Sequence, residues 1–138
     1  MNNLKIDKIK RPYFIGIGGI GVSAIAKMFL HRDVDVSGSD INESPVIDEL
    51  KKFGANIYLE HDANNIPDEC DLVVYTNALL EDNVELVEAR KRGIRTLSYP
   101  EVLGEVSREK FVIAISGNAG KTTTTALLGQ ILINAGLE

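Results

Sequence analysis

Two glycine-rich loops of different kinds dominate the chemistry that this 138-residue sequence could perform. The first reads Gly16-Ile17-Gly18-Gly19-Ile20-Gly21, a GxGxxG pattern typical of a turn that holds a diphosphate. The second reads Gly117-Asn118-Ala119-Gly120-Lys121-Thr122, and its GKT core is typical of loops that hold a nucleoside triphosphate with magnesium. Together they indicate an enzyme that joins a nucleotide-linked substrate to a second molecule and consumes ATP.

The glycines of the first loop have separate predicted tasks. Gly16 permits a tight turn, Gly18 lets the backbone approach a diphosphate, and Gly21 lets the next helix pack on the preceding strand. That helix directs its free N–H groups and the positive end of its dipole at the anion. Asp40 stands 19 residues after Gly21 (40 − 21), a spacing that suits a carboxylate accepting from a ribose hydroxyl. NAD, FAD and a UDP-sugar all fit this pattern, because each has a diphosphate and a ribose.

The second loop predicts an ATP site with a magnesium ion. Its backbone amides would surround the β- and γ-phosphates, and Lys121 would neutralise their charge. Ile115 occupies the position six before the lysine where the strict Walker pattern has glycine, so this is a shorter GxxGKT variant. The predicted ATP-binding residues are Gly117, Asn118, Ala119, Gly120, Lys121, Thr122 and Thr123, with the hydroxyls of Thr122 and Thr123 as magnesium ligands.

Strands and helices that alternate along the chain would position these loops. Short apolar runs predict strands at 13–17, 34–37, 55–59, 72–75 and 95–98. Helical periodicity and capping residues predict helices from Gly21 to Leu30, from Pro45 to Phe53, from the Asn83 cap to Arg92, and a short one from Pro100. Five such units predict an α/β fold with a Rossmann-like parallel sheet and flanking helices.

A change to polar and charged composition at 104–110 predicts a domain boundary. We expect a Rossmann-like domain at 1–107, followed at 108–138 by the first β-loop-α unit of a P-loop ATPase-type central domain. A strand at 111–116 and a helix at 122–135 would form that incomplete unit. Without sheet neighbours it would leave apolar surface uncovered, at Leu127, Leu128, Ile131 and Leu132.

Composition excludes several functional classes. The net charge of −5 argues against nucleic acid as a partner. A single cysteine, Cys70, excludes an intramolecular disulfide and fits a reducing cytoplasm. The apolar stretch 13–30 superficially resembles a signal peptide, but four glycines and Lys27 interrupt it. We therefore expect a cytoplasmic protein with no membrane insertion.

With both loops in order, the sequence from Tyr13 onward resembles the Mur ligase family. The resemblance rests on the order and spacing of both loops rather than on either alone. The residues that carry it are Phe14 to Ser23, Gly38-Ser39-Asp40, His61 with Ala63-Asn64-Asn65-Ile66, Thr76-Asn77-Ala78, Asp82-Asn83, and Gly120-Lys121 with Thr122 to Thr125.

The resemblance implies an ATP-dependent ligase that joins L-alanine to UDP-N-acetylmuramate through an acyl phosphate. The implied UDP-sugar contacts are Gly16, Gly18, Gly19, Ile20, Gly21, Ser39, Asp40, Thr76, Asn77 and Ala78. The family's catalytic and amino-acid-binding groups would lie beyond Glu138, which leaves Lys121 as a phosphate stabiliser. We therefore expect this span to bind the UDP-sugar without turnover.

The sequence departs from the family pattern at two places. Asn118-Ala119 replaces a threonine followed by histidine, asparagine or aspartate, and Glu60 precedes His61 where the family commonly has glycine. Alternatives remain: a ligase that recycles murein peptides, or a non-catalytic Rossmann module that senses NAD or another nucleotide. A dehydrogenase is less favoured because it leaves the second loop unexplained. The sequence does not predict an oligomeric state.

Overall fold

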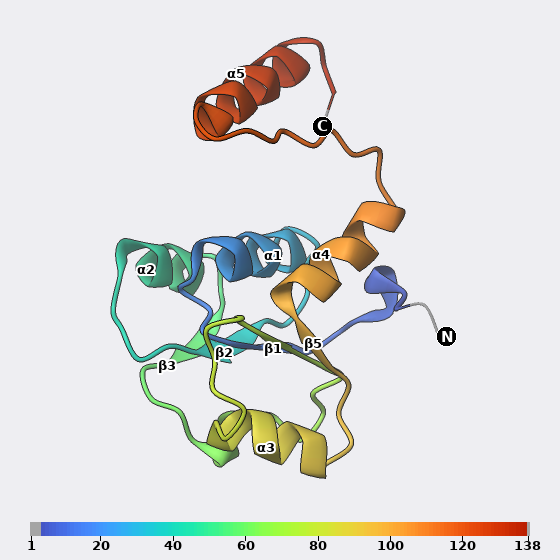
Figure 1. Cartoon of the computed structure of the whole chain (residues 1–138). Helices are drawn as coiled ribbons and strands as arrows, with labels where there is room; N and C mark the ends of the chain where they lie inside the picture. The colour runs from blue at the N-terminus through green and yellow to red at the C-terminus, as the bar shows by residue number, and fades with distance from the viewer. Residues whose placement is uncertain (1–3, 138) are drawn as a thin grey trace.

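The computed structural model describes residues 4–137, and its main body is a five-stranded parallel sheet (Figure 1). The strands lie in the order β3-β2-β1-β4-β5, and every neighbouring pair is parallel. This confirms the predicted Rossmann-like sheet. The strands are β1 (Pro12–Ile15), β2 (Ser37–Ser39), β3 (Asn56–Tyr58), β4 (Leu72–Tyr75) and β5 (Thr96–Ser98).

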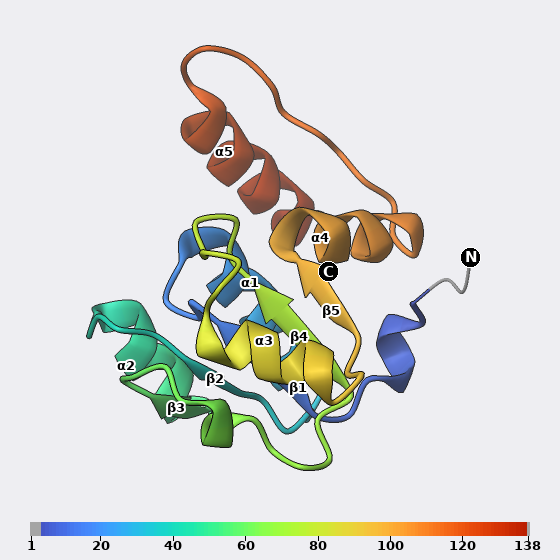
Figure 2. The same cartoon turned by 60° about the horizontal axis from the view of Figure 1, so that its bottom comes forward.

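Helices cover both faces of the sheet (Figures 1 and 2). One face packs against α1 (Ile20–Leu30), α2 (Pro45–Lys52) and α4 (Tyr99–Arg108), and the other against α3 (Val84–Lys91). Two short 3₁₀ turns, η1 (Ile6–Lys8) and η2 (Ala63–Asn65), and the helix α5 (Lys121–Asn134) complete the described chain. Within residues 4–137, no helix combines the length and apolarity needed to cross a bilayer.

The helices begin where the predicted capping residues stand. The Ser44 hydroxyl accepts from the Ile47 amide at 3.3 Å, and Pro45 occupies the first turn of α2. The Asn83 side chain accepts from the amides of Glu85 and Leu86 at 3.0 and 3.1 Å. These bonds satisfy amides that a helix start otherwise leaves unpaired.

Strand β2 lies further along the chain than its apolar pattern predicts. The predicted strand was 34–37, whereas the sheet uses Ser37–Ser39. A Cβ atom on Gly38 would lie 2.4 Å from the Phe14 carbonyl oxygen of β1, so only glycine allows the two strands this approach. The shift places Asp40 directly after the strand, at the carboxyl edge of the sheet.

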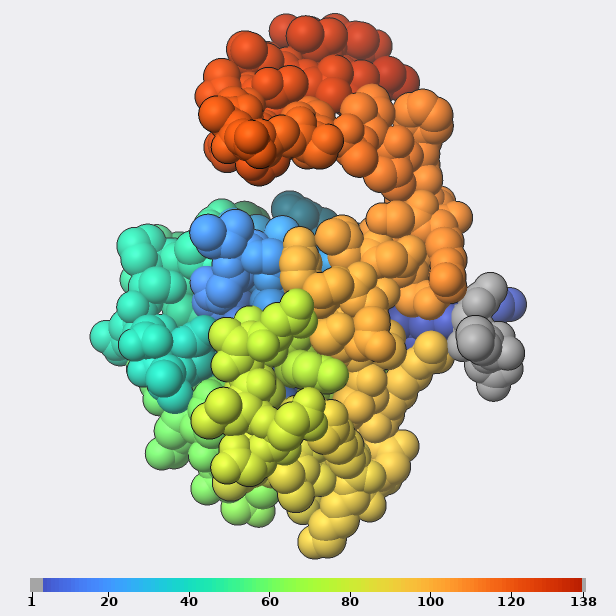
Figure 3. All heavy atoms as spheres, in the orientation of Figure 1, coloured from blue at the N-terminus to red at the C-terminus, as the bar shows by residue number. Residues whose placement is uncertain are grey.

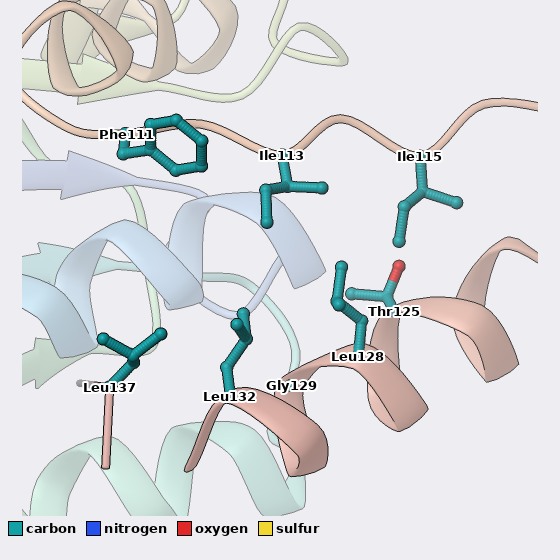
Figure 4. A pocket seen from close by; sticks show the side chains of 8 residues that line it. All are labelled: Phe111, Ile113, Ile115, Thr125, Leu128, Gly129, Leu132 and Leu137. Carbon is teal, nitrogen blue, oxygen red and sulfur yellow. The ribbon is translucent and has the colours of Figure 1, made fainter. Parts of the chain in front are cut away.

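The predicted strand at 111–116 is absent from every sheet of the described residues. Its side chains still alternate as in a strand: Phe111, Ile113 and Ile115 point toward α5 across an apolar groove of about 450 Å³ (Figure 4). A strand needs a neighbour to share its hydrogen bonds, and no other part of residues 4–137 provides one here. Figure 3 shows this unit attached to the main body through the chain that follows α4.

The surface of α5 matches the predicted shortage of packing partners in part. None of its described residues is buried, and Leu127 and Ile131 are 62% and 63% exposed. Leu128 and Leu132 are half-buried and line the apolar groove. The main body around the sheet, by contrast, buries large side chains such as Phe14, Phe29 and Leu72 completely. Helix α4 ends at Arg108, one residue past the predicted boundary, and the division into domains at 107/108 stays a prediction.

Burial of Cys70 gives the first testable consequence of this core. Burial raises the pKa of its thiol from 9.0 to about 11. Because the folded pKa lies above the unfolded one, this contribution to stability is complete below pH 9 and is lost as the pH rises through 11. We expect Ellman's reagent at pH 8 to react at least tenfold faster in urea than with native protein. Equal rates would contradict the burial.

Candidate functional site

The first glycine loop forms the tight turn that its pattern predicts. Gly16 has φ of +76°, a left-handed conformation that glycine adopts without strain. The amides of Gly16 and Ile17 donate to the Ser39 carbonyl at 2.8 and 3.0 Å, and the Gly19 amide donates back to the Gly16 carbonyl at 3.1 Å. Two backbone hydrogen bonds therefore join the loop to the end of β2.

Asp40 lies against this loop at the carboxyl edge of the sheet. One carboxylate oxygen accepts from the Gly18 amide at 2.9 Å, and the other accepts from the Asn42 amide at 3.0 Å. Each oxygen keeps acceptor capacity for a further donor such as a ribose hydroxyl. A cleft of about 270 Å³ opens here, lined by Gly18, Gly19, Asp40, Asn42 and Ser44. The sequence pattern did not indicate Asn42 or Ser44 as part of it.

The start of α1 supplies free amide groups beside the cleft. The first hydrogen bond of the helix runs from the Ser23 amide to the Gly19 carbonyl at 2.8 Å. The amides of Ile20 and Gly21 therefore have no partner within the helix. The Ile20 side chain is 92% exposed. Unpaired amides and a helix dipole favour an anion at this position.

The structure brings the predicted residues after β4 next to the loop. The Thr76 methyl carbon would lie 2.7 Å from a Cβ atom on Gly16, so the two residues are in contact across neighbouring strands. The Thr76 hydroxyl accepts from the Ala78 amide at 3.4 Å, and the side chains of Asn77 and Ala78 are exposed. The predicted contacts thus meet at one edge, where β1 and β4 adjoin and their helices leave on opposite faces, a common ligand position in such sheets.

Ser39 occupies a different environment from the other predicted contacts. Its side chain is fully buried, and its hydroxyl donates to the Glu85 carboxylate of α3 at 2.6 Å. The Tyr13 hydroxyl donates to the same carboxylate at 2.7 Å. Burial, with Glu85 beside it, raises the pKa of Tyr13 well above its ordinary range, so this phenol remains a donor. Ser39 therefore reaches the cleft only through its neighbour Asp40.

Tyr99 explains the third glycine of the loop, which the sequence pattern assigned to packing of helix on strand. A Cβ atom on Gly21 would lie 2.4 to 2.8 Å from three ring atoms of Tyr99, the first residue of α4. Any larger residue at position 21 would therefore clash with the Tyr99 ring, which lies directly after β5. Tyr99 was not predicted as part of this region.

We expect Gly21→Ala to lower the free energy of unfolding by about 1–3 kcal/mol, because the new methyl group displaces the Tyr99 ring. Tyr99→Ala in the same chain should recover part of that loss, since the obstacle is gone. Urea unfolding of the two single variants, the double variant and the wild type measures this coupling. Strictly additive effects would show that the two residues do not contact each other.

The second loop lies between the extended segment 111–116 and α5. Gly117 and Gly120 have φ of +149° and +75°, both in the region that favours glycine. The Lys121 ammonium group donates to the Gly117 carbonyl, and the Thr122 and Thr123 side chains are exposed in the first turn of α5. These groups are of the chemical types that bind a triphosphate with Mg²⁺: a glycine loop, a helix start, one lysine and two hydroxyls. Asn118 and Ala119 lie exposed on this loop.

A parallel sheet with a diphosphate-type loop at its switch point defines a Rossmann-like domain, a class in which nucleotides commonly bind at this edge. Residues 11–111 match the model of the Mur ligase family, catalytic domain. The chain belongs to the Mur ligase family.

Two curated relatives have the same description. A UDP-N-acetylmuramate–L-alanine ligase of Aquifex aeolicus is 48% identical over 132 residues, which cover 96% of this chain and 29% of the relative. Another, from Clostridium acetobutylicum, is 47% identical over 137 residues, 99% of this chain and 30% of the relative. The chain therefore spans about 30% of the length of the curated relatives it matches.

Solved structures agree with this assignment of fold. A UDP-N-acetylmuramate–alanine ligase of Thermotoga maritima matches with a TM-score of 0.82 and 39% identity, over 90% of this chain and 29% of that one. A second solved structure is a UDP-N-acetylmuramate:L-alanyl-γ-D-glutamyl-meso-diaminopimelate ligase of Neisseria meningitides. It matches with a TM-score of 0.83 and 28% identity, over 93% of this chain and 40% of that one.

Proposed function

We propose that this chain is the nucleotide-binding part of an ATP-dependent ligase that joins L-alanine to UDP-N-acetylmuramate in peptidoglycan synthesis. The observation that carries the proposal is the first loop, where free amides and the Asp40 carboxylate meet at one cleft. The names of the relatives supply the substrate class, which the loop alone leaves open.

In this proposal each part of the cleft recognises a different part of the UDP-sugar. The diphosphate lies against the amides of Ile20 and Gly21, because the Gly18 amide is already bonded to Asp40. The Asp40 carboxylate accepts from the ribose. Thr76 to Ala78 border the nucleotide from the β4 side, next to Gly16.

The second loop has a separate role in the proposal. Gly117 to Thr123 hold ATP, Lys121 offsets phosphate charge, and the hydroxyls of Thr122 and Thr123 face the magnesium ion. ATP supplies the phosphoryl group that activates the substrate carboxylate for attack by the amino group of L-alanine. The reaction takes place in the cytoplasm, which fits a chain whose only cysteine has no partner for an internal disulfide.

Two other functions are less well supported. A murein-peptide ligase has the same fold, but two solved ligases of that kind are 28% and 32% identical, whereas a solved alanine ligase is 39% identical and curated L-alanine ligases reach 48%. A sensor of NAD or another nucleotide would have no use for the lysine and threonines of the second loop. Identity therefore favours the L-alanine ligase over the murein-peptide ligase, and the second loop favours it over the sensor.

Phosphorus NMR tests the proposal on the 138-residue chain. Both diphosphate resonances of UDP-N-acetylmuramate should shift or broaden saturably when protein is added, and those of NADH should not. When L-alanine and Mg-ATP are then supplied, we expect no growth of the inorganic phosphate signal, because the chain spans only about 30% of the length of the ligases it matches. Unchanged UDP-sugar resonances would contradict the binding role, and phosphate release would contradict the lack of turnover.

A further inference from the structure

A fully buried carboxylate joins several segments near the carboxyl edge of the sheet. Glu85 is 0% exposed, although it stands in the first turn of α3. One of its oxygens accepts from the Tyr13 hydroxyl at 2.7 Å and from the Asn65 amide group at 3.2 Å. The other accepts from the Ser39 hydroxyl at 2.6 Å and lies 2.8 Å from Nδ1 of His61. Hydrogen-bond donors around a buried carboxylate stabilise its anion, so β1, the end of β2 and the segment after β3 all bind to α3 at this one side chain.

Ser39 connects Glu85 to one side of the nucleotide cleft. It is the last residue of β2, and its carbonyl oxygen accepts from the amides of residues 16 and 17 at 2.8 and 3.0 Å. The next residue, Asp40, lines the cleft, and its carboxylate accepts from a further amide of the glycine loop at 2.9 Å. The glycine loop and Asp40 are therefore both attached to a residue whose side chain is bonded to Glu85.

The start of α3 connects Glu85 to the residues on the β4 side of the site. Segment 76–83 runs from the end of β4 directly into α3, and Glu85 stands two residues after it. The segment contains two local turns, 76–79 and 80–83, each closed by an amide-to-carbonyl hydrogen bond of 3.1 Å. Leu80 in the second turn is 73% exposed. Turns of this kind do not determine where the segment lies relative to Asp40, whereas the hydrogen bond from Ser39 to Glu85 connects the two sides.

We propose that Glu85 is a positioning residue that holds the segment after β4 in a fixed place relative to Asp40. Because Glu85 is completely covered, it cannot touch the ligand, and it acts through Ser39 on one side and through the start of α3 on the other. Figure 1 shows α3 on the face of the sheet opposite α1, the helix of the glycine loop. A site whose two sides are already fixed loses less conformational entropy on binding than one whose sides move independently. This inference rests on the proposed function, because it assigns the support of the same cleft.

The alternative is that Glu85 only stabilises the fold. Ser39→Ala and Tyr13→Phe separate the two roles, because each removes one buried hydroxyl that donates to Glu85 at almost the same distance. Tyr13 lies within β1, paired to β2 on one side and to β4 on the other, and its variant is the matched control. We expect both variants to unfold at a lower urea concentration than the wild type. At a temperature where all three proteins are folded, calorimetric affinity for UDP-N-acetylmuramate should fall about tenfold in Ser39→Ala and less than about twofold in Tyr13→Phe.

Glu85→Gln shows whether Ser39 acts through Glu85. The glutamine keeps the shape of the side chain but places an amide donor among other donors, so at least one contact is lost. We expect this variant to bind about tenfold more weakly than the wild type, and adding Ser39→Ala to it should weaken binding less than about twofold further. If Glu85→Gln does not fold, the affinities of Ser39→Ala and Tyr13→Phe decide alone.

Three results would each overturn the positioning role. They are wild-type affinity in Ser39→Ala, equal losses of affinity in Ser39→Ala and Tyr13→Phe, and a full further loss when Ser39→Ala is added to Glu85→Gln. The last result would mean that Ser39 affects the ligand independently of Glu85. Failure of the wild type to bind UDP-N-acetylmuramate would contradict the proposed function itself.

Discussion

Gly38→Ala is expected to lower the free energy of unfolding by about 3 kcal/mol or more, enough to leave a large unfolded fraction in a domain of ordinary stability. The added Cβ atom would lie 2.4 Å from the Phe14 carbonyl oxygen, 3.1 Å from the Phe14 Cβ atom and 3.0 Å from Ile17 Cδ1. The nearest of these is backbone of β1, which is paired to β2 on one side and β4 on the other. The Phe14 backbone cannot move without breaking the hydrogen bonds that join β1 to β2 or to β4.

Urea unfolding measures this loss, with Gly104→Ala as the matched control. Gly104 lies inside α4, and a Cβ atom there would meet nothing within 4 Å. The same glycine-to-alanine change should therefore stabilise the protein by about 0.5–1 kcal/mol through helix propensity. If the free energy of unfolding of Gly38→Ala lies within about 1 kcal/mol of the wild-type value, the centre of the sheet is less tightly packed than its geometry indicates.

Gly18→Val should weaken binding of UDP-N-acetylmuramate at least a hundredfold, a loss of about 2.7 kcal/mol. A Cβ atom on Gly18 would lie 2.9 Å from the Asp40 carboxylate and 3.2 Å from Ile47 Cδ1. The valine therefore displaces Asp40 from the Gly18 amide and fills the cleft where the diphosphate approaches. Two predicted contacts are lost through one substitution.

The fold should survive this second change, because both neighbours are ends of side chains that can rotate away. Titration calorimetry on Gly18→Val, Gly104→Ala and the wild type separates the effects. Gly104→Ala lies away from the cleft and should bind as the wild type does. A Gly18→Val protein that binds within threefold of the wild type would show that the UDP-sugar does not use this loop.

Much of the fold could be predicted because local patterns and tertiary packing agree. Strand β4 has the predicted limits, and α1, α2 and α3 lie within one residue of their predicted limits. The caps of α2 and α3 make the expected hydrogen bonds. Strand β2 could not be located from its composition. Ser37-Gly38-Ser39 lacks an apolar run, and the fit of Gly38 against Phe14 decides where the strand lies.

The residues of the candidate site could likewise be predicted only in part. The glycine loop and Asp40 are close in sequence and were predicted from spacing, and the structure joins them by a hydrogen bond. Glu85 and Tyr99 were missed because their partners are distant in the chain. Glu85 has the appearance of an ordinary acidic residue in the first turn of a capped helix, and only the folded sheet shows that it is buried against Tyr13, 72 positions away.

The most direct test of the nucleotide-binding role is a calorimetric titration of the wild-type chain with UDP-N-acetylmuramate and, in parallel, with NADH. Both ligands present a diphosphate and a ribose, so the comparison isolates the class of nucleotide. We predict saturable binding of one UDP-sugar per chain and no heat from NADH beyond dilution. Binding of NADH with no response to UDP-N-acetylmuramate would contradict the ligase assignment and indicate a dinucleotide sensor instead.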